Sequence, residues 1–386
     1  MIPPSGRSGI AENLTPLMLM LLSLALGAVI LVLAILWTTG IMVFSFGGRS
    51  HFPVDGKTVI LTGSSQGMGG EIACLLAARG ANLVLVARTE KNLKATVQRA
   101  KKCAKEPADQ RFTYIAADVT SEAENARILR EATAWNHGRM PEIVWCVAGS
   151  STPGLFVETS TETLRQQMDL NYFATAYMAQ KALQAWLYPE VPYHTRDKPT
   201  SPESPRKFIM TSSALAFVNI AGYSPYSPAK AALRSLADGL RSEVQLYNAA
   251  RHSNVKADFT PAPFDVNIHI VFPGSILSPG FEKENKTKHP VSMELESADP
   301  KQTELEAAQS CLDGLDKGHF MTPTNWLVHL MRWGSLSGSE KNNWLIDAIG
   351  ALVSVIAWWF IAPDMNRTVR GWGKKNGMPA FRPNAQ

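Results

Sequence analysis

The chain has 386 residues, of which 45% are apolar, and it carries a formal net charge of +5. Such a length suits one large domain or two ordinary ones, and the apolar share is that of a packed globular protein. The modest charge forms no long basic run, which argues against a nucleic-acid-binding protein. The cysteines lie far apart with no C-x-x-C pair, so we expect a reducing compartment and neither a disulfide framework nor a metal site.

An uncharged apolar run spans residues 17–37, within a leader that we place at 1–45. Its length is close to the roughly 20 residues that a helix needs to cross a bilayer, so we predict a retained N-terminal transmembrane helix. A cleaved signal peptide is the alternative, but its apolar core is shorter and its leader is basic, whereas only Arg7 and Glu12 are charged here. Arg49 and Lys57 follow the run, which favours a cytosolic face for the next domain.

Residues 55–325 alternate between short β-rich runs and longer helical patterns. The runs are mostly continuous apolar, as in strands buried on both faces, and fall at 58–62, 82–87, 112–117, 143–147, 207–212, 267–272 and 319–322. The helical patterns fall at 67–79, 90–104, 121–136, 161–187 and 224–248. This alternation predicts an α/β fold with a doubly wound, Rossmann-type parallel sheet of about seven strands. Proline-rich and charged residues at 188–207 and 250–264 indicate exposed loops.

A glycine-rich turn joins the first predicted strand to the first helix. The sequence TGSSQGMGG places Gly63, Gly67 and Gly69 in a G-x-x-x-G-x-G spacing. Glycines leave the backbone open where a pyrophosphate approaches a helix N-terminus, whose amides and dipole favour negative charge. A flexible turn could have the same composition, but the position between a buried strand and a helix indicates dinucleotide binding.

Three later strand ends carry residues suited to the same cofactor. Arg88 follows the second strand, with no acidic residue between 83 and 88, and an arginine here accommodates the 2′-phosphate of NADPH. The alternative for Arg88 is a solvated charge at the start of a helix. Asp118 follows the third strand, where it could accept a hydrogen bond from the adenine amine. Gly149, after the fourth strand, leaves room for the cofactor to lie against the backbone.

The stretch GYSPYSPAK, residues 222–230, contains two tyrosines and one lysine. Tyr226 and Lys230 are four residues apart and would share one helix face, whereas Tyr223 lies two turns from the lysine. A free phenol has a pKa near ~10, and a neighbouring ammonium lowers it. The phenol could then act as a general acid towards a carbonyl that receives hydride. A serine of MTSSA (210–214), at the end of the preceding strand, could polarise the same carbonyl.

The C-terminal part, residues 326–386, contains a second apolar stretch at 344–363, followed by a basic tail. This stretch includes Asp347 and Gly350 and has a tryptophan-rich end. If the main domain and the tail are both cytosolic, a single complete span is excluded. A re-entrant or interface-lying segment fits the charges better, so we predict a membrane-associated segment. A buried core helix is the alternative.

Together these motifs resemble those of the short-chain dehydrogenase/reductase family. The matching elements are TGSSQGMG at 62–69, Ala148-Gly149, Asn171 in DLNYF, Ser213 and the YSPAK of 226–230. The resemblance covers roughly residues 55–325. Within the family the chain looks most like fungal enzymes that reduce a sphingolipid precursor, because of GKTVILTGSSQGMG and the apolar segments near both ends.

The resemblance implies a role for each matching residue. Tyr226 would be the general acid/base, and Lys230 would lower its pKa and hold the nicotinamide ribose. Ser213 would orient the ketone, with Ser212 as the alternative, and Asn171 would support a proton relay. NADPH would be bound by the glycine turn and the strand ends, through Gly63, Ser64, Ser65, Gln66, Gly67, Gly69, Arg88, Asp118, Gly149, Tyr226, Lys230, Pro273 and Ile276.

The resemblance also implies a reaction: NADPH-dependent reduction of 3-ketosphinganine (3-ketodihydrosphingosine) to sphinganine, at the cytosolic face of the endoplasmic reticulum membrane. The expected partners are a long-chain keto-lipid substrate, the membrane, and a second copy of the chain paired through the helices at 161–187 and 224–248. One alternative is a membrane-anchored reductase or dehydrogenase of steroid, retinoid or fatty acyl ketones. A non-catalytic nucleotide-binding membrane adaptor is the other. Cys146 and Val147 stand where many relatives have asparagines.

Overall fold

The structure is a computed structural model that describes residues 50–189, 204–253 and 261–378. The predicted transmembrane helix at 17–37 lies outside these residues, as does most of the loop predicted at 188–207. The chain divides into two compact units, residues 1–49 and 50–386, and all elements described below belong to the second.

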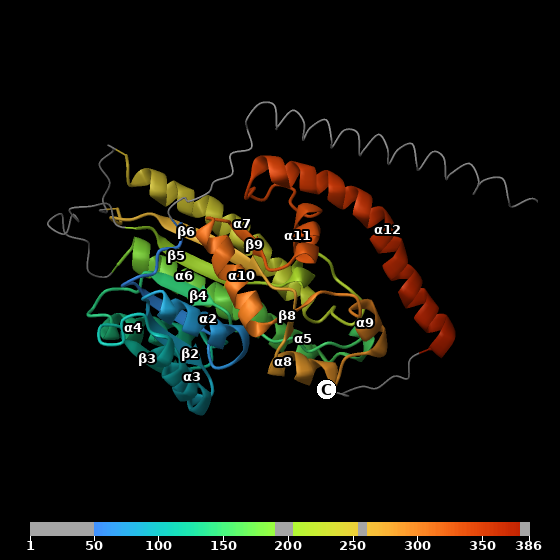
Figure 1. Cartoon of the computed structure of the whole chain (residues 1–386), viewed down its shortest axis with the longest axis horizontal. Helices are drawn as coiled ribbons and strands as arrows, with labels where there is room; N and C mark the ends of the chain where they lie inside the picture. Colours follow the sequence, from blue (N-terminus) through green and yellow to red (C-terminus); the bar gives the residue numbers. More distant parts are fainter. Residues whose placement is uncertain (1–49, 190–203, 254–260, 379–386) are drawn as a thin grey trace, which may run out of the picture. The chain divides into compact units, whose positions relative to one another are not determined.

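A seven-stranded sheet forms the centre of this unit, in the order β3-β2-β1-β4-β5-β6-β9 (Figure 1). Every neighbouring pair in it is parallel. The strands are β1 (Thr58–Thr62), β2 (Asn82–Ala87), β3 (Phe112–Ala116), β4 (Ile143–Cys146), β5 (Arg206–Thr211), β6 (Val266–Phe272) and β9 (Met321–Pro323). The doubly wound parallel sheet is therefore confirmed. Its strand order reverses between β1 and β4, where such sheets form a ligand-binding crevice at the carboxyl ends.

Helices cover both faces of the sheet (Figure 1). On one face lie α2 (Gly67–Ala78), α3 (Glu90–Cys103) and α10 (Glu304–Asp316). On the other lie α4 (Glu122–Trp135), α6 (Ala174–Leu187) and α7 (Ser227–Ala250). Short elements complete the described chain: η1 (Phe156–Glu158), α5 (Thr161–Met168), η2 (Asp169–Phe173), η4 (Ala214–Ala216), β7 (Ser275–Leu277), α8 (Pro279–Asn285), α9 (Pro290–Leu295), β8 (Lys301–Thr303) and α11 (Trp326–Trp333).

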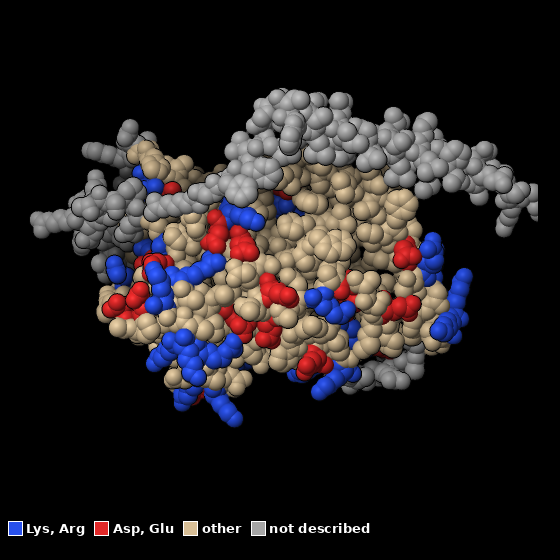
Figure 2. Space-filling model, viewed as in Figure 1, with Lys and Arg blue, Asp and Glu red and all other residues tan. Residues whose placement is uncertain are grey.

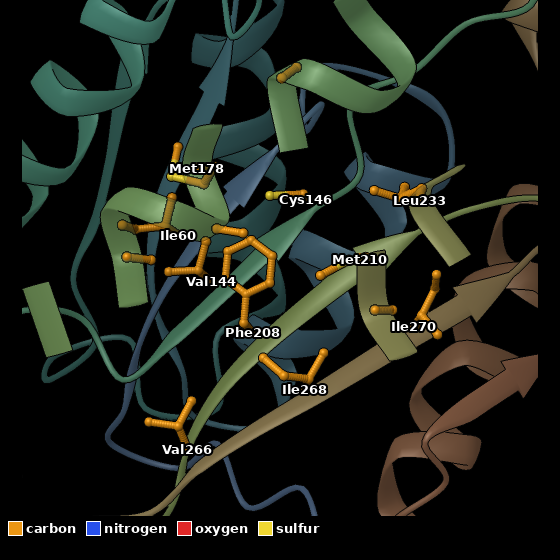
Figure 3. Packing of buried hydrophobic residues seen from close by; sticks show 14 of the residues in the cluster. Ile60, Val144, Cys146, Met178, Phe208, Met210, Leu233, Val266, Ile268 and Ile270 are labelled. Atoms are coloured by element: carbon orange, nitrogen blue, oxygen red, sulfur yellow. The ribbon is translucent and has the colours of Figure 1, made fainter. Parts of the chain in front are cut away.

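The core consists of two apolar layers, one on each side of the sheet. Successive side chains of a strand point to opposite faces, so Ile60 packs under α6 and α7 while Leu61 packs under α2. Figure 3 shows the layer that contains Ile60, in which Val144 and Phe208 lie against Met178 of α6. Because both faces are buried, the strands are nearly continuously apolar, which is why the sequence located them within one or two residues.

The structure departs from the predicted helices in three places. The helix predicted at 161–187 is interrupted by a π turn, η2, which includes Asn171 and is wider than an α-helical turn. The helix predicted at 224–248 begins at Ser227, directly after Tyr226, and carries Pro228 in its first turn, where the missing amide costs little. Residues 276–320, for which no helix was predicted, contain α8, α9 and α10. Two of these are only six or seven residues long, too short for a clear helical period.

The C-terminal helix α12 (Trp344–Asn376) reverses the usual amphipathic arrangement. Its buried residues are Asp347, Gly350 and Ser354, which pack on α11, while Trp344 and Trp359 are 74% and 66% exposed. The alternative of a buried core helix is therefore wrong. In the part of the chain that the structure describes, α12 is the one helix long and apolar enough to cross a membrane. Figure 2 shows basic side chains towards the end of α12.

Candidate active site

The glycine turn after β1 has the geometry that close approach of a ligand requires. Gly63 and Gly67 both have a φ of +66°, a conformation that side chains disfavour. A Cβ at Gly63 would lie 2.5 Å from the Ala148 nitrogen, and one at Gly69 would lie 2.3 Å from the Gly63 oxygen. The turn is thus packed tightly against the end of β4, and α2 begins at its last residues with free amides. Such a cradle fits a dinucleotide pyrophosphate.

The side chains of this turn differ in their availability to a ligand. Ser64 is buried, and its hydroxyl donates to the Val86 oxygen at 3.3 Å, so it ties the turn to β2. Ser65 is half-buried and Gln66 is exposed. We therefore expect Ser65 and Gln66, and the backbone of Ser64, to contact a cofactor.

Three other predicted cofactor residues follow the carboxyl ends of strands in the central sheet, and a fourth lies in β7. Arg88 is exposed after β2, and its guanidinium has no hydrogen-bond partner among the described residues. Asp118 is exposed after β3, where its Oδ1 accepts from the amide and hydroxyl of Thr120 at 3.0 and 2.8 Å. Pro273 is buried after β6, and Ile276 is half-buried in β7. Because β2, β3 and β6 are parallel members of one sheet, Arg88, Asp118 and Pro273 share one edge of it, whereas Ile276 belongs to the separate two-stranded sheet of β7 and β8.

Tyr226, Lys230 and Ser213 meet at the same edge. The Lys230 nitrogen lies 5.6 Å from the centre of the Tyr226 ring and donates to the Thr211 oxygen at 3.1 Å. Lys230 is buried and Tyr226 is half-buried. The predicted pairing of Tyr226 and Lys230 at the start of α7 is therefore present.

The electrostatics of this pair differ from the sequence prediction. Burial raises the pKa of the Tyr226 phenol, the Ser213 hydroxyl opposes this by hydrogen bonding, and the charge of Glu284 adds to it. Burial also lowers the pKa of Lys230 to about 8. The prediction that the ammonium lowers the pKa of the phenol is wrong in this structure. The phenol stays protonated, as a proton donor must.

The structure distinguishes the two candidate serines. The Ser212 hydroxyl is buried and donates to the Lys230 backbone oxygen at 2.9 Å, so it holds α7 against β5. The Ser213 hydroxyl is half-buried, accepts from the Leu215 amide at 3.2 Å and hydrogen-bonds the Tyr226 phenol. Of the two serines, Ser213 is the one whose hydroxyl acts on the Tyr226 phenol.

Asn171 links the π turn to the loop after β4. It is buried, its amide donates to the Ser150 oxygen at 2.9 Å, and its oxygen accepts from the Ser150 nitrogen at 3.2 Å. A Cβ at Gly149 would lie 2.9 Å from the Asn171 oxygen and 3.1 Å from the Lys230 nitrogen. Gly149, Asn171 and Lys230 are thus close neighbours, although they come from three different elements. A proton could pass among such groups or through water beside them.

Sequence reasoning missed the surroundings of Tyr223. Its hydroxyl donates to Glu284 of α8, and its ring centre lies 6.3 Å from that of Tyr226. Tyr223 therefore holds the segment that covers the site. The sequence offered only the adjacency of the two tyrosines as a signal, since Glu284 is 61 residues away.

Fold and site together define a class of oxidoreductase with a nicotinamide cofactor. The family model for short chain dehydrogenases matches residues 57–289, and the chain belongs to this family.

Two relatives are similar over nearly their whole lengths. The 3-ketodihydrosphingosine reductase ksrA of Aspergillus fumigatus is 44% identical over 88% of this chain and 92% of its own. The 3-ketodihydrosphingosine reductase gsl-3 of Neurospora crassa is 39% identical over 94% of this chain and 93% of its own.

Solved structures share the fold at lower identity. A short-chain dehydrogenase from Sphingobium yanoikuyae in complex with NADPH is 21% identical, with a TM-score of 0.55 over 73% of this chain and 93% of that one. A short chain dehydrogenase/reductase from Burkholderia phymatum in complex with NAD is 18% identical, with a TM-score of 0.56 over 76% of this chain and 98% of that one. The fold thus occurs with either nicotinamide cofactor, and the choice between them depends on side chains.

Proposed function

We propose that this protein catalyses the NADPH-dependent reduction of 3-ketodihydrosphingosine (3-ketosphinganine) to sphinganine. One observation carries the proposal: two relatives of that name match the chain over about nine-tenths of both lengths, at 44% and 39% identity. The gathering of Ser213, Tyr226 and Lys230 at one edge of the sheet supports a working reductase rather than an adaptor.

The residues present fit a phosphorylated dinucleotide. The Gly63–Gly69 turn and the start of α2 would hold the pyrophosphate, and Asp118 would receive the adenine. Arg88, which is exposed and unpaired within the described chain, would bind the 2′-phosphate and so favour NADPH over NADH. When bound, NADPH supplies the hydride that reduces the ketone carbon.

The protein's own residues would supply the proton that the ketone oxygen receives. Tyr226 would donate its phenolic proton to the ketone oxygen, which becomes the alcohol, and Ser213 would hold that oxygen in place. Lys230 would bind the nicotinamide ribose and, with a pKa of about 8, could return a proton to Tyr226 near neutral pH. Asn171, held in the π turn, would position the chain of groups that connects Lys230 to solvent.

The outer face of α12 supports a place at a membrane. Its docked residues are polar or small, whereas Leu352, Val355 and Phe360 point outward and are half or more exposed. Arg367, Arg370, Lys374 and Lys375 follow in the same helix. We propose that α12 lies against the cytosolic surface of the endoplasmic reticulum membrane, where a long-chain ketone would accumulate. Pairing of two copies through α5, α6 and α7 stays a prediction.

A substrate comparison tests this function. The purified full-length protein should oxidise NADPH in the presence of 3-ketodihydrosphingosine in detergent or lipid, and much more slowly in the presence of a steroid ketone. Formation of sphinganine, measured by mass spectrometry, would identify the product. Turnover of the steroid ketone alone would contradict the proposal.

A further inference from the structure

A buried charged cluster lies next to the catalytic tyrosine; we define it as Tyr223, Glu284, Lys288 and Glu296. The Lys288 nitrogen lies 3.0 Å from Glu284 Oε1 and 2.6 Å from Glu296 Oε2, and its side chain is fully buried. Tyr223 donates to the same Oε1 of Glu284. The Lys288 nitrogen also lies 5.5 Å from the centre of the Tyr223 ring. These groups join α8 and α9 to the loop that carries Tyr226.

The cluster belongs to the cover of the active site. Segment 279–296 follows Pro273 and β7 along the chain, and Ser292 of α9 donates to the Ala221 oxygen at 2.7 Å. A Cβ at Gly222 would lie 2.0 Å from the Ser292 hydroxyl, so the two segments are in tight contact. Tyr223 contacts both Glu284 and the ring of Tyr226. In addition, the charge of Glu284 raises the pKa of the Tyr226 phenol, so the carboxylate acts at the reacting position.

The charges in this cluster do not balance. Two carboxylates share one ammonium. The shorter ion pair, Lys288 with Glu296, already neutralises the charge of Lys288. Both contacts of Glu284 use Oε1, and its Oε2 receives no hydrogen bond from the residues that the structure describes. Nearby, burial and the charge of Glu296 raise the pKa of Asp299 to about 6, while Lys301 and Lys288 oppose the shift. A half-buried carboxylate with an open oxygen favours a second cation.

We infer that Glu284 recognises the ammonium group of an amino ketone whose carbonyl lies at Tyr226. The inference rests on the proposed function, because 3-ketodihydrosphingosine carries its amine on the carbon next to the ketone. The carbonyl oxygen at Tyr226 and the ammonium at Glu284 would then be held by adjacent groups of one cluster. A steroid or simple fatty ketone has no ammonium group, so the Glu284 carboxylate would face an apolar surface. This disfavours the binding of such ketones. Glu284 thus determines specificity.

The test compares two substrates in three proteins. The substrates are 3-ketodihydrosphingosine and the same hydroxyketone with hydrogen in place of the amine. The proteins are wild type, Glu284→Gln, and Glu282→Gln as a control on the exposed side of α8. Glu284→Gln keeps the size of the side chain and an acceptor for Tyr223. It should lower kcat/KM for the amino ketone by about 10- to 100-fold, the range for losing a charged hydrogen bond, and leave the amine-free ketone unchanged.

The outcomes separate this inference from the proposed function. Equal loss on both substrates in Glu284→Gln, or a wild-type enzyme that reduces both ketones equally well, would overturn the role of Glu284 while leaving the reductase assignment intact. Turnover of neither ketone, with turnover of a steroid ketone, would overturn the proposed function itself. If Glu284→Gln does not fold, as judged by its melting temperature, the wild-type ratio of the two kcat/KM values decides the question.

Discussion

Tyr226 is half-buried, and the setting of its phenol suits a proton donor. Burial keeps the phenol protonated, and Ser213 aligns it. We expect Tyr226→Phe to lower kcat by about 10²–10⁴-fold, because the ketone oxygen then has no acid beside it. Binding of NADPH, followed by fluorescence titration, should change little. Tyr247→Phe, at the far end of α7, serves as the control. Turnover that survives Tyr226→Phe would contradict the assignment.

The two adjacent serines should respond differently to the same change. Ser213→Ala removes the hydroxyl that holds the carbonyl oxygen, so we expect kcat to fall by about 10²-fold with stability unchanged. Ser212→Ala removes a buried hydrogen bond to the Lys230 oxygen, so we expect it to lower the free energy of unfolding by about 1 kcal/mol and to retain most turnover. Steady-state kinetics and denaturant titration measure the two effects. A reversed pattern would make Ser212 the catalytic serine.

Arg88 is the residue on which we propose that the choice of cofactor depends. Its guanidinium is exposed at the end of β2, where the 2′-phosphate would lie. We expect Arg88→Ala to raise the Kd of NADPH by about 10- to 100-fold, and the Kd of NADH by much less, because only NADPH carries that phosphate. Arg130→Ala, also exposed but on α4, controls for the loss of a charge. Equal weakening of both cofactors in Arg88→Ala would remove it from the 2′-phosphate site.

At the scale of elements, one buried ion pair docks α12. Arg332 of α11 and Asp347 of α12 form two parallel hydrogen bonds of 2.8 and 2.7 Å, and the Trp333 indole donates to Asp347 Oδ1 at 3.0 Å. A Cβ at Gly350 would lie 2.2 Å from the Trp333 ring, so the helices are in direct contact there. The aspartate that interrupts the apolar sequence is thus the group that holds this helix to the domain.

Removing that aspartate should release α12. We expect Asp347→Ala to destabilise the docked state by about 3–5 kcal/mol, because it leaves Arg332 buried without a partner. Hydrogen exchange along α11 and α12 measures the effect. Asp364 offers a matched control, since its pair with Arg367 is 3.0 Å long but exposed and should contribute less than about 1 kcal/mol. If exchange in α11 and the start of α12 is unchanged in Asp347→Ala, the ion pair does not dock the helix.

At the scale of the whole molecule, the buried His269 and the half-buried His319 make stability depend on pH. Burial lowers the pKa of both His269 and His319 to about 4, and the His269 Nδ1 contacts the His319 oxygen at 2.9 Å. Unfolded histidine titrates near ~6.5, so between about pH 6.5 and 4 the unfolded chain binds more protons than the folded one. The contribution of these histidines to the free energy of unfolding is therefore fully present above about pH 6.5 and is lost as the pH falls through this window.

A single substitution should reduce this dependence. We expect His269→Asn to flatten the slope of unfolding free energy against pH by up to about 1.4 kcal/mol per pH unit, because one titrating group is removed while a donor to the His319 oxygen is kept. Denaturant titrations at several pH values between 4 and 7 measure the slope. The exposed His252 gives the control, His252→Asn. An unchanged slope in His269→Asn would mean that other groups cause the acid sensitivity.

The sequence by itself determined the sheet, the glycine turn and the Tyr226–Lys230 pair. Each depends on local information: apolar runs of strand length, a backbone that must adopt positive φ at Gly63, and a spacing of four residues at the start of a helix. The tertiary structure decided the rest, because the partners are distant along the chain. Ser212 contacts Lys230 from 18 residues away and Tyr223 contacts Glu284 from 61, so no local pattern distinguishes the surroundings of Ser212 from those of Ser213 or reveals the charged cluster beside the site.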